Sequence, residues 1–299
     1  MAHNNHFFSG RANLGANYGR EARVHQVLDN DALVRRAPSI FADSAHDSRS
    51  KRYVHIPTFD VIEGLRNEGF LPVHVQQARA RTEDKSAFTK HIIRFRHDSQ
   101  MQDVRSLEGD WRKHEWYEVV LVNSHDGSSG YVMTGGWFRF VCLNGMVFGD
   151  KGMEVRVRHS GRDCIQKVVE GAFAVLNQKE RVAGSRELMA ATVLDAAEQQ
   201  AYATAMTAIR YASHIEAGQT PPVDPMSVLT PHRSEDDGNS VWQLFNRAQE
   251  NLTQGGLRTT ETNRRTYTRG ITGMTDHSVN QLMWAFTQQV AELKQSQAA

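Results

Sequence analysis

The stretch His91-Ile-Ile-Arg-Phe-Arg-His97 decides the fold class of this chain. Its apolar residues Ile93 and Phe95 alternate with Arg94 and Arg96. Successive side chains of a β-strand point to opposite faces of the sheet. The alternation therefore predicts a strand with one apolar face and one face that carries two arginines.

Stretches on both sides of it have the same extended character. The Asn144-Gly145 pair signals a tight hairpin turn, because Asn-Gly supplies the positive φ angles that such a turn needs. Before the first strand, apolar residues at helical spacing predict a helix over 59–68. We expect strands at about 73–81, 88–97, 116–123, 131–141, 146–149 and 153–159.

The spacing of apolar residues changes in the second half of the chain. Apolar residues there recur at spacings of three, four and seven, which is typical of amphipathic helices. We expect helices at about 163–176, 185–216, 241–252 and 279–294. Since strands and helices are segregated along the chain, we predict an α+β fold. It comprises an antiparallel sheet of about five strands with packed helices, followed by a helical C-terminal half.

Composition shifts suggest the domain organisation. Residues 1–30 are rich in Asn, Gly, His and Arg without a sustained period and are expected to form a flexible N-terminal arm. The α+β core domain is expected over 31–218. Pro221-Pro222 and a polar, acidic stretch mark a linker or loop at 219–240, and a helical region follows at 241–299.

Bulk composition excludes several classes of protein. The 299 residues are 39% hydrophobic and 23% charged, which is near the globular average. There is no apolar run of ~18 residues for a membrane-spanning helix, and the N-terminus does not look like a secretory signal. The two cysteines, Cys142 and Cys164, read as reduced thiols. We expect a cytoplasmic protein with no membrane association.

The charges are nearly balanced. The chain has 35 Lys and Arg against 34 Asp and Glu, which argues against binding nucleic acid by bulk charge alone. Of the cations, eight are lysine and 27 are arginine, whose planar fork fits phosphate oxygens bidentately. In the alternative interpretation, codon usage and surface ion pairs account for this excess, so position along the chain must decide.

Three expected strands each carry two arginines at period two. They are Arg79 and Arg81, Arg94 and Arg96, and Arg156 and Arg158. If the strands are neighbours and their faces coincide, they form a guanidinium field ~10–15 Å across that follows a phosphate backbone. In the alternative interpretation the arginines form solvated ion pairs with the nearby acids Glu83, Asp84, Asp98, Glu115 and Glu154.

Two further features extend the candidate nucleic-acid interface. Trp137, between Gly136 and Phe138, is either a platform on which bases stack or part of the core. The Gly/Thr-rich stretch 255–273 holds one acid, Glu261, and is expected to be a basic loop that contacts phosphate or is simply solvated. Its arginines are Arg258, Arg264, Arg265 and Arg269.

Signals for catalysis are weak. His and Asp pairs occur, but none lies in a recognised hydrolase or metalloenzyme motif. We therefore predict no catalytic residue, no metal site and no cofactor. Glu154 and Asp163 are the carboxylates that a metal-dependent nuclease would need to bring together, and nothing in their spacing demands it.

Several strings resemble the YafZ/YfjQ-like family found on phages and plasmids. They include Ala37-Pro-Ser-Ile-Phe-Ala42, Glu68-Gly-Phe70, Phe140-Val-Cys-Leu-Asn-Gly145 and the stretch from Trp242 to Leu252. The resemblance covers about 31–295 and implies a mobile-element, cytoplasmic origin, but it supplies no agreed activity or catalytic residue. The order of elements is also similar to that of single-strand annealing recombination proteins, which implies DNA held in a basic groove of an oligomeric ring.

These observations favour a mobile-element DNA-binding protein that binds or anneals single-stranded DNA in recombination. They also favour a homo-oligomer without enzymatic activity. Two alternatives stay open. One is an anti-defence or regulatory protein that binds a host defence protein, and the other is a metal-dependent nuclease.

Overall fold

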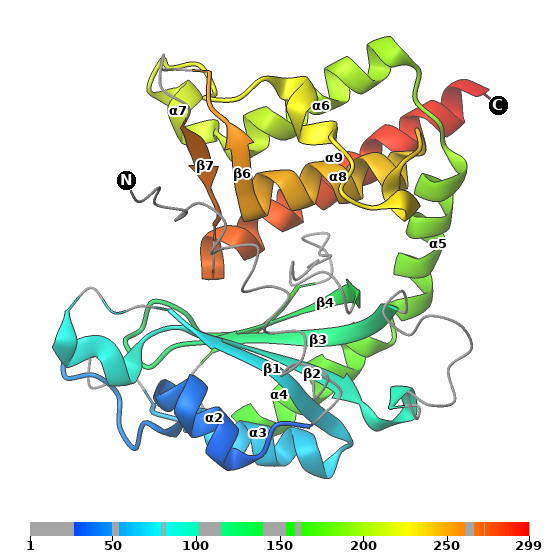
Figure 1. The fold of residues 1–299 in the computed structure, drawn as a ribbon. Helices are drawn as coiled ribbons and strands as arrows, with labels where there is room; N and C mark the ends of the chain where they lie inside the picture. The colour runs from blue at the N-terminus through cyan, green and yellow to red at the C-terminus, as the bar shows by residue number, and fades with distance from the viewer. Residues whose placement is uncertain are drawn as a thin grey trace, which may run out of the picture.

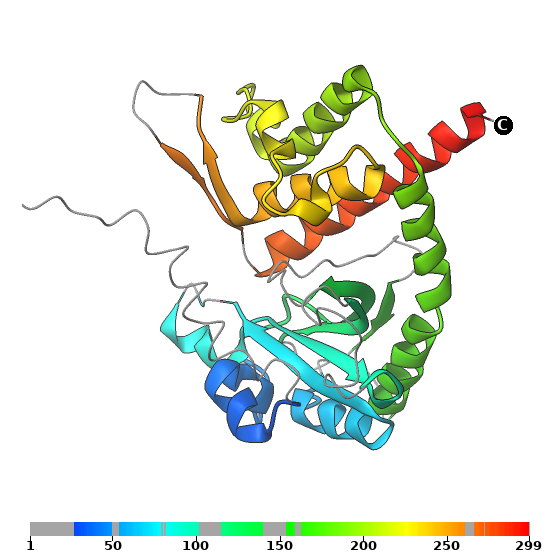
Figure 2. The ribbon, with the colours of Figure 1, turned by 45° about the vertical axis from the view of Figure 1, so that its right-hand side comes forward.

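The protein is built in layers (Figure 1). The computed structural model describes residues 27–49, 54–78, 80, 82–101, 115–139, 154–158, 163–260, 266–271 and 273–298. An antiparallel sheet lies between a lower set of helices and an upper set, and helix α5 runs along one side from one set to the other (Figures 1 and 2). The predicted α+β class is confirmed.

The sheet has five strands in the order β1-β2-β3-β4-β5, and each neighbouring pair is antiparallel. The strand predicted at 73–81 begins earlier than expected, because Pro72 is tolerated on an edge strand, where the pairing shifts between Pro72 and His74. The strand expected at 146–149 lies outside the described residues. The strands are β1 (Phe70–Gln77), β2 (His91–His97), β3 (Glu115–Asn123), β4 (Tyr131–Arg139) and β5 (Val155–Val157).

The lower face of the sheet carries the main core. Ile93, Phe95 and Leu121 are fully buried on it, as the alternation predicts. Helix α3 ends where Gly69 takes a φ of +82°, a conformation that favours glycine. The covering helices are α2 (Asn30–Arg36), α3 (Thr58–Asn67) and α4 (Cys164–Leu176), with the 3-10 turns η1 (Pro38–Phe41), η2 (Glu83–Phe88) and η3 (Asp98–Gln100).

The end of the predicted N-terminal arm is part of the fold. Leu28 is buried, and its N–H donates to the carbonyl of Pro72 at 2.7 Å. Asp29 then caps α2, since its Oδ1 accepts from the N–H of Ala32 at 2.7 Å. Residues 1–26 of the predicted arm lie outside the described residues.

The upper layer is helical. The stretch predicted as one helix over 185–216 is three helices, because Asp195 starts a new helix through a capping box with Glu198. The segment predicted as a linker packs on α8 with Val228 and Leu229 buried. The elements are α5 (Lys179–Ala191), α6 (Ala196–Arg210), α7 (Ala212–Glu216), η7 (Pro225–Leu229), η8 (Ser234–Asp236), α8 (Val241–Gln254) and α9 (Gly273–Ala298).

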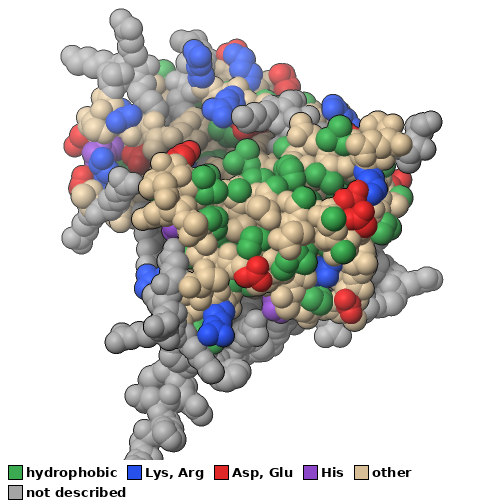
Figure 3. All heavy atoms as spheres, turned by 90° about the horizontal axis from the view of Figure 1, so that it is seen from above, with side chains coloured by type: hydrophobic (Ala, Val, Ile, Leu, Met, Phe, Trp, Pro, Cys, Tyr) green, Lys and Arg blue, Asp and Glu red, His purple; other side chains and the backbone are tan. Residues whose placement is uncertain are grey.

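The core of this layer is aromatic. The ring centroids of Phe245 and Trp284 lie 5.6 Å apart at 77°, an edge-to-face arrangement between α8 and α9. Seen from above, the outer face shows hydrophobic side chains over its middle and most charged side chains toward its edges (Figure 3). No helix among the described residues is long and apolar enough to cross a membrane.

A small hairpin stands out from the upper layer (Figure 2). It is formed by β6 (Gly255–Arg258) and β7 (Tyr267–Arg269), which pair antiparallel. Gly255 has a φ of +72°, and a Cβ there would lie 2.6 Å from the backbone carbon of Arg269. Glycine is therefore required for α8 to turn into the hairpin. The stretch predicted as a loop thus contains two strands.

Candidate nucleic-acid interface

Arg94 and Arg96 share the upper face of the sheet, and one carboxylate holds both. Glu118 on β3 is fully buried. Its Oε2 lies 2.8 Å from Nε of Arg94, and its Oε1 lies 2.5 Å from a terminal nitrogen of Arg96. The two arginine side chains are only 16% and 5% exposed. The prediction that this pair presents open guanidinium groups is therefore wrong, because Glu118 binds both within the fold.

The surroundings of this cluster are largely desolvated. The guanidinium of Arg96 lies 4.5 Å from the centroid of the Trp116 ring, a cation–π contact. Burial, with help from Arg94 and Arg36, lowers the pKa of His74 to about 3. Burial also lowers the pKa of Arg94, which the charge of Glu118 opposes. A neutral His74 beside paired arginines indicates a structural ion cluster.

Trp137 lies on the other face of the sheet. It pairs with Tyr117 across β3 and β4, and their ring centroids are 5.6 Å apart. The ammonium of Lys179 lies 5.9 Å from the centroid of its ring. Because Tyr117 belongs to the lower core, the half-buried Trp137 does not share a surface with Arg94 and Arg96.

The second described arginine pair lies at the edge strand β5, with Arg156 on the strand and Arg158 directly after it. Arg156 is the cross-strand partner of Val132, so it faces the same side as Arg94 but three strands away, about 14 Å. Its Nε donates to Glu154, while 74% of its side chain is exposed. Arg158 is exposed as well. Arg79, Arg81, Arg264 and Arg265 lie outside the described residues, so among the described arginines no continuous field forms.

The β6–β7 hairpin brings together two arginines that the sequence analysis identified and a tyrosine that it did not. Arg258 and Tyr267 are direct cross-strand partners, and Arg269 follows Tyr267 by two residues, so all three point to one face. All three are exposed, Tyr267 by 49%. On the opposite face Leu257 is buried. We call Arg258, Tyr267 and Arg269 the hairpin face.

Neither arginine of the hairpin face forms an ion pair or side-chain hydrogen bond with another described residue. The strands pair through the backbone, and Thr268 Oγ1 accepts from the N–H of Leu257 at 3.1 Å, so the arginines are not needed to hold the hairpin together. Sequence reasoning singled out the arginines but missed Tyr267. The alternation Tyr267-Thr268-Arg269 could have indicated a strand with Tyr267 and Arg269 on one face. It was missed because this stretch was expected to be a loop.

A buried polar network around Thr58 was also missed. The Thr58 hydroxyl lies 3.0 Å from Nε2 of both His91 and His125, and Nδ2 of Asn123 donates to it at 2.9 Å. A hydroxyl has one donor and two acceptor positions, so these three contacts fill its capacity. The network joins the start of α3 to strands β2 and β3 and to His125, two residues beyond the end of β3. We interpret its role as structural, because it fixes the start of α3 to the sheet.

Two observations in the described part of the chain concern metal-binding and carboxylate groups. No three His, Cys, Asp or Glu side chains there are placed to hold a metal ion. Asp163 contacts Lys167 at 3.2 Å, and Glu154 binds Arg156, so each of these acids faces a cation.

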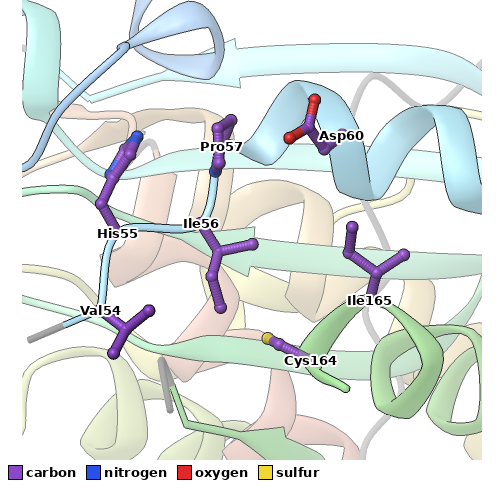
Figure 4. A pocket seen from close by; sticks show the side chains of 7 residues that line it. All are labelled: Val54, His55, Ile56, Pro57, Asp60, Cys164 and Ile165. Atoms are coloured by element: carbon purple, nitrogen blue, oxygen red, sulfur yellow. The ribbon is translucent and has the colours of Figure 1, made fainter. Parts of the chain in front are cut away.

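A mostly apolar pocket of about 410 Å³ lies where α4 begins. In it the carboxylate of Asp60 and the imidazole of His55 point away from the Cys164 thiol (Figure 4). Burial raises the pKa of that thiol, which makes it a weaker nucleophile. The pocket therefore lacks an activated nucleophile.

Comparison with known proteins identifies relatives along most of the chain. The model of a family described as a domain of unknown function (DUF932) matches residues 45–293. The protein YfjQ of Escherichia coli K12 is 37% identical over 268 residues, which cover 89% of this chain and 92% of YfjQ. YafZ of the same organism is 36% identical over the same shares. No solved structure matches significantly.

Proposed function

The chain belongs to the DUF932 family, and we propose that it binds nucleic acid with the β6–β7 hairpin as its contact arm. The observation that carries the proposal is the hairpin face. There two exposed arginines flank an exposed tyrosine on an element that stands out from the helical layer (Figure 2). Arginine binds phosphate bidentately, and an aromatic ring stacks on bases of any sequence.

Single-stranded DNA fits this face better than a duplex does. A base can stack on Tyr267 only when it is not already enclosed in a base-paired stack. Two cations on one short ribbon suit a backbone that passes across it. We therefore extend the proposal to binding or annealing of single strands during recombination of a mobile element, by a cytoplasmic homo-oligomer. No specific observation favours a host-protein binder or a nuclease.

The test measures binding of a labelled oligo-dT of about 20 nucleotides by fluorescence anisotropy, from about 50 to 300 mM NaCl. The variant R258Q/R269Q removes both cations of the hairpin face. Its plot of log K against log salt should lose about 1.4 of its slope, because each phosphate contact on a single strand contributes about 0.7. Tyr267→Ala should lose ~1–3 kcal/mol of affinity at every salt concentration.

The matched control is R35Q/R36Q. These arginines are exposed on α2, below the sheet, and the variant removes the same two charges. It should bind oligo-dT like the unchanged protein. Equal losses in the two double variants, or no binding of the unchanged protein at the lowest salt, would refute the proposal. Tighter binding to a duplex of the same length would contradict the single-strand part.

A further inference from the structure

A groove runs between the edge strand β5 and helix α4, in the lower part of the molecule. Its cavity has a volume of about 420 Å³. Lys167 and Glu170 line it from the helix. Arg156 and Arg158 line it at the open edge of the sheet, because Arg156 projects from the face of β5 that α4 does not cover. Three cations and one acid therefore line the groove. This charge balance differs from that of the whole chain, whose net charge is only +1.

The close approach of helix and strand depends on Gly171. A Cβ at this position would lie 2.9 Å from a methyl carbon of Val155 and 2.4 Å from Cε of Met133. Those distances are too short for any larger residue without a shift. Gly171 and Ala174 also line the groove, so that part of its wall is small and uncharged. The close packing of α4 on β5 thus forms part of the groove wall.

The cations keep binding capacity. Only Nε of Arg156 is bound, by Glu154, and its terminal nitrogens contact no other described residue. Arg158 makes no side-chain contact of this kind within the described residues. Lys167 lies 3.2 Å from Asp163, and both side chains are more than half exposed, at 53% and 66%. Such a pair is worth ~0–1 kcal/mol, so an anion can replace Asp163 at little cost.

We infer that this groove binds phosphate groups, with Arg156, Arg158 and Lys167 as the ligands of the phosphate oxygens. Residues two apart in an extended backbone lie ~6.6 Å apart, and both arginines line this groove. The cavity is larger than one phosphate, and the small residues Gly171 and Ala174 on one wall leave room for an attached sugar. The inference deepens the proposed function, because it gives the bound strand a second contact in a different layer from the hairpin.

Phosphate chemistry has two possible sources here, a nucleic-acid backbone and a small phosphate compound, and the test separates them. Inorganic pyrophosphate is titrated by calorimetry, and the labelled oligo-dT is titrated by anisotropy. The variant R156Q/R158Q should weaken pyrophosphate binding at least tenfold, because it removes two charge-assisted contacts. It should also reduce the salt slope for oligo-dT by about 1.4.

Two controls isolate the groove. R35Q/R36Q removes the same charge elsewhere and should bind both probes like the unchanged protein. R156K/R158K keeps the charges and should recover most of the pyrophosphate binding, which a folding defect would not. R258Q/R269Q should bind pyrophosphate normally and lose only oligo-dT affinity.

The outcomes are distinguishable from those that test the hairpin. If pyrophosphate does not bind, or binds R156Q/R158Q as tightly as the unchanged protein, the groove inference is wrong even when oligo-dT binds through the hairpin. If pyrophosphate depends on the groove and oligo-dT does not bind at all, the proposed function fails. In that case the groove stands as a site for a small phosphate compound. If R156Q/R158Q loses affinity for both pyrophosphate and oligo-dT, the result supports a nucleic-acid backbone as the source of the bound phosphate.

Discussion

Replacing Glu118 with glutamine tests whether the upper face of the sheet is held together by its ion cluster. The substitution keeps the shape of the side chain and removes the charge that two buried arginines share. Glu118 makes contacts of 2.8 Å with Arg94 and 2.5 Å with Arg96. Each charge-assisted contact contributes ~1.5–3 kcal/mol, so both together account for ~3–6 kcal/mol. Breaking a buried ion pair typically costs ~3–5 kcal/mol, which agrees.

The assay is chemical and thermal unfolding followed by circular dichroism. A loss of ~3 kcal/mol lowers the Tm of a chain of this size by about 6 °C, taking ~2 °C per kcal/mol. The matched control is Glu154→Gln, which also removes one carboxylate from an arginine. Because 74% of the Arg156 side chain is exposed, the control should cost no more than ~1 kcal/mol.

A loss below ~1 kcal/mol in Glu118→Gln, or one equal to that of the control, would refute the structural role of the cluster. Oligo-dT binding offers a second criterion. If Arg94 and Arg96 were phosphate contacts masked by Glu118, the variant would bind oligo-dT more tightly. A structural role predicts unchanged affinity for whatever fraction of the variant is folded.

Three further outcomes follow from the described contacts. Thr58→Val should cost ~1–3 kcal/mol of unfolding free energy, because it leaves buried imidazole and amide groups without their hydroxyl partner. The control Thr204→Val, on the exposed side of α6, should change stability little. The pKa of His74 is about 3 in the fold and 6.5 in the unfolded chain. Between these pH values the unfolded chain binds more protons than the fold does, so stability falls as the pH drops below 6.5. His74→Gln should remove up to ~2 kcal/mol of that loss at pH ~5, measured by urea unfolding. Gly255→Ala should disturb the hairpin and weaken oligo-dT binding. The control Gly184→Ala lies in α5, where a Cβ meets nothing within 4 Å, so it should raise the Tm slightly and leave oligo-dT binding unchanged.

Local periodicity was enough to predict much of the fold. The alternation at 91–97 matches β2, His91–His97, and the helical spacing at 163–176 matches α4, Cys164–Leu176. Both patterns arise because one face of the element is buried, and burial leaves its period in the sequence. Where a helix breaks, as between α5 and α6, the cause is a cap, Asp195, whose effect depends on few residues and is easily overlooked.

The candidate site was harder, because it depends on register. Glu118 lies 22 residues from Arg96, and only the pairing of Phe95 with Val119 brings the two together. Sequence proximity pointed to other acids, such as Asp98 and Glu115. Trp137 shows the same limit, since its face follows from its pairing with Tyr117 and cannot be read from its neighbours along the chain. No local pattern reports such long-range pairing.

The two described Arg-x-Arg pairs show why position in the sheet decides what an arginine can do. Arg94 and Arg96 are on β2, between two other strands, where desolvation makes an unpaired guanidinium costly, so the fold supplies Glu118. Arg156 and Arg158 are on or directly after β5, the edge strand, where water already compensates their charge and no buried acid is required. A phosphate can displace water or a weak surface pair, but it cannot displace a buried carboxylate that holds two strands together. The same sequence pattern therefore stabilises the sheet at its centre and offers a binding site at its edge.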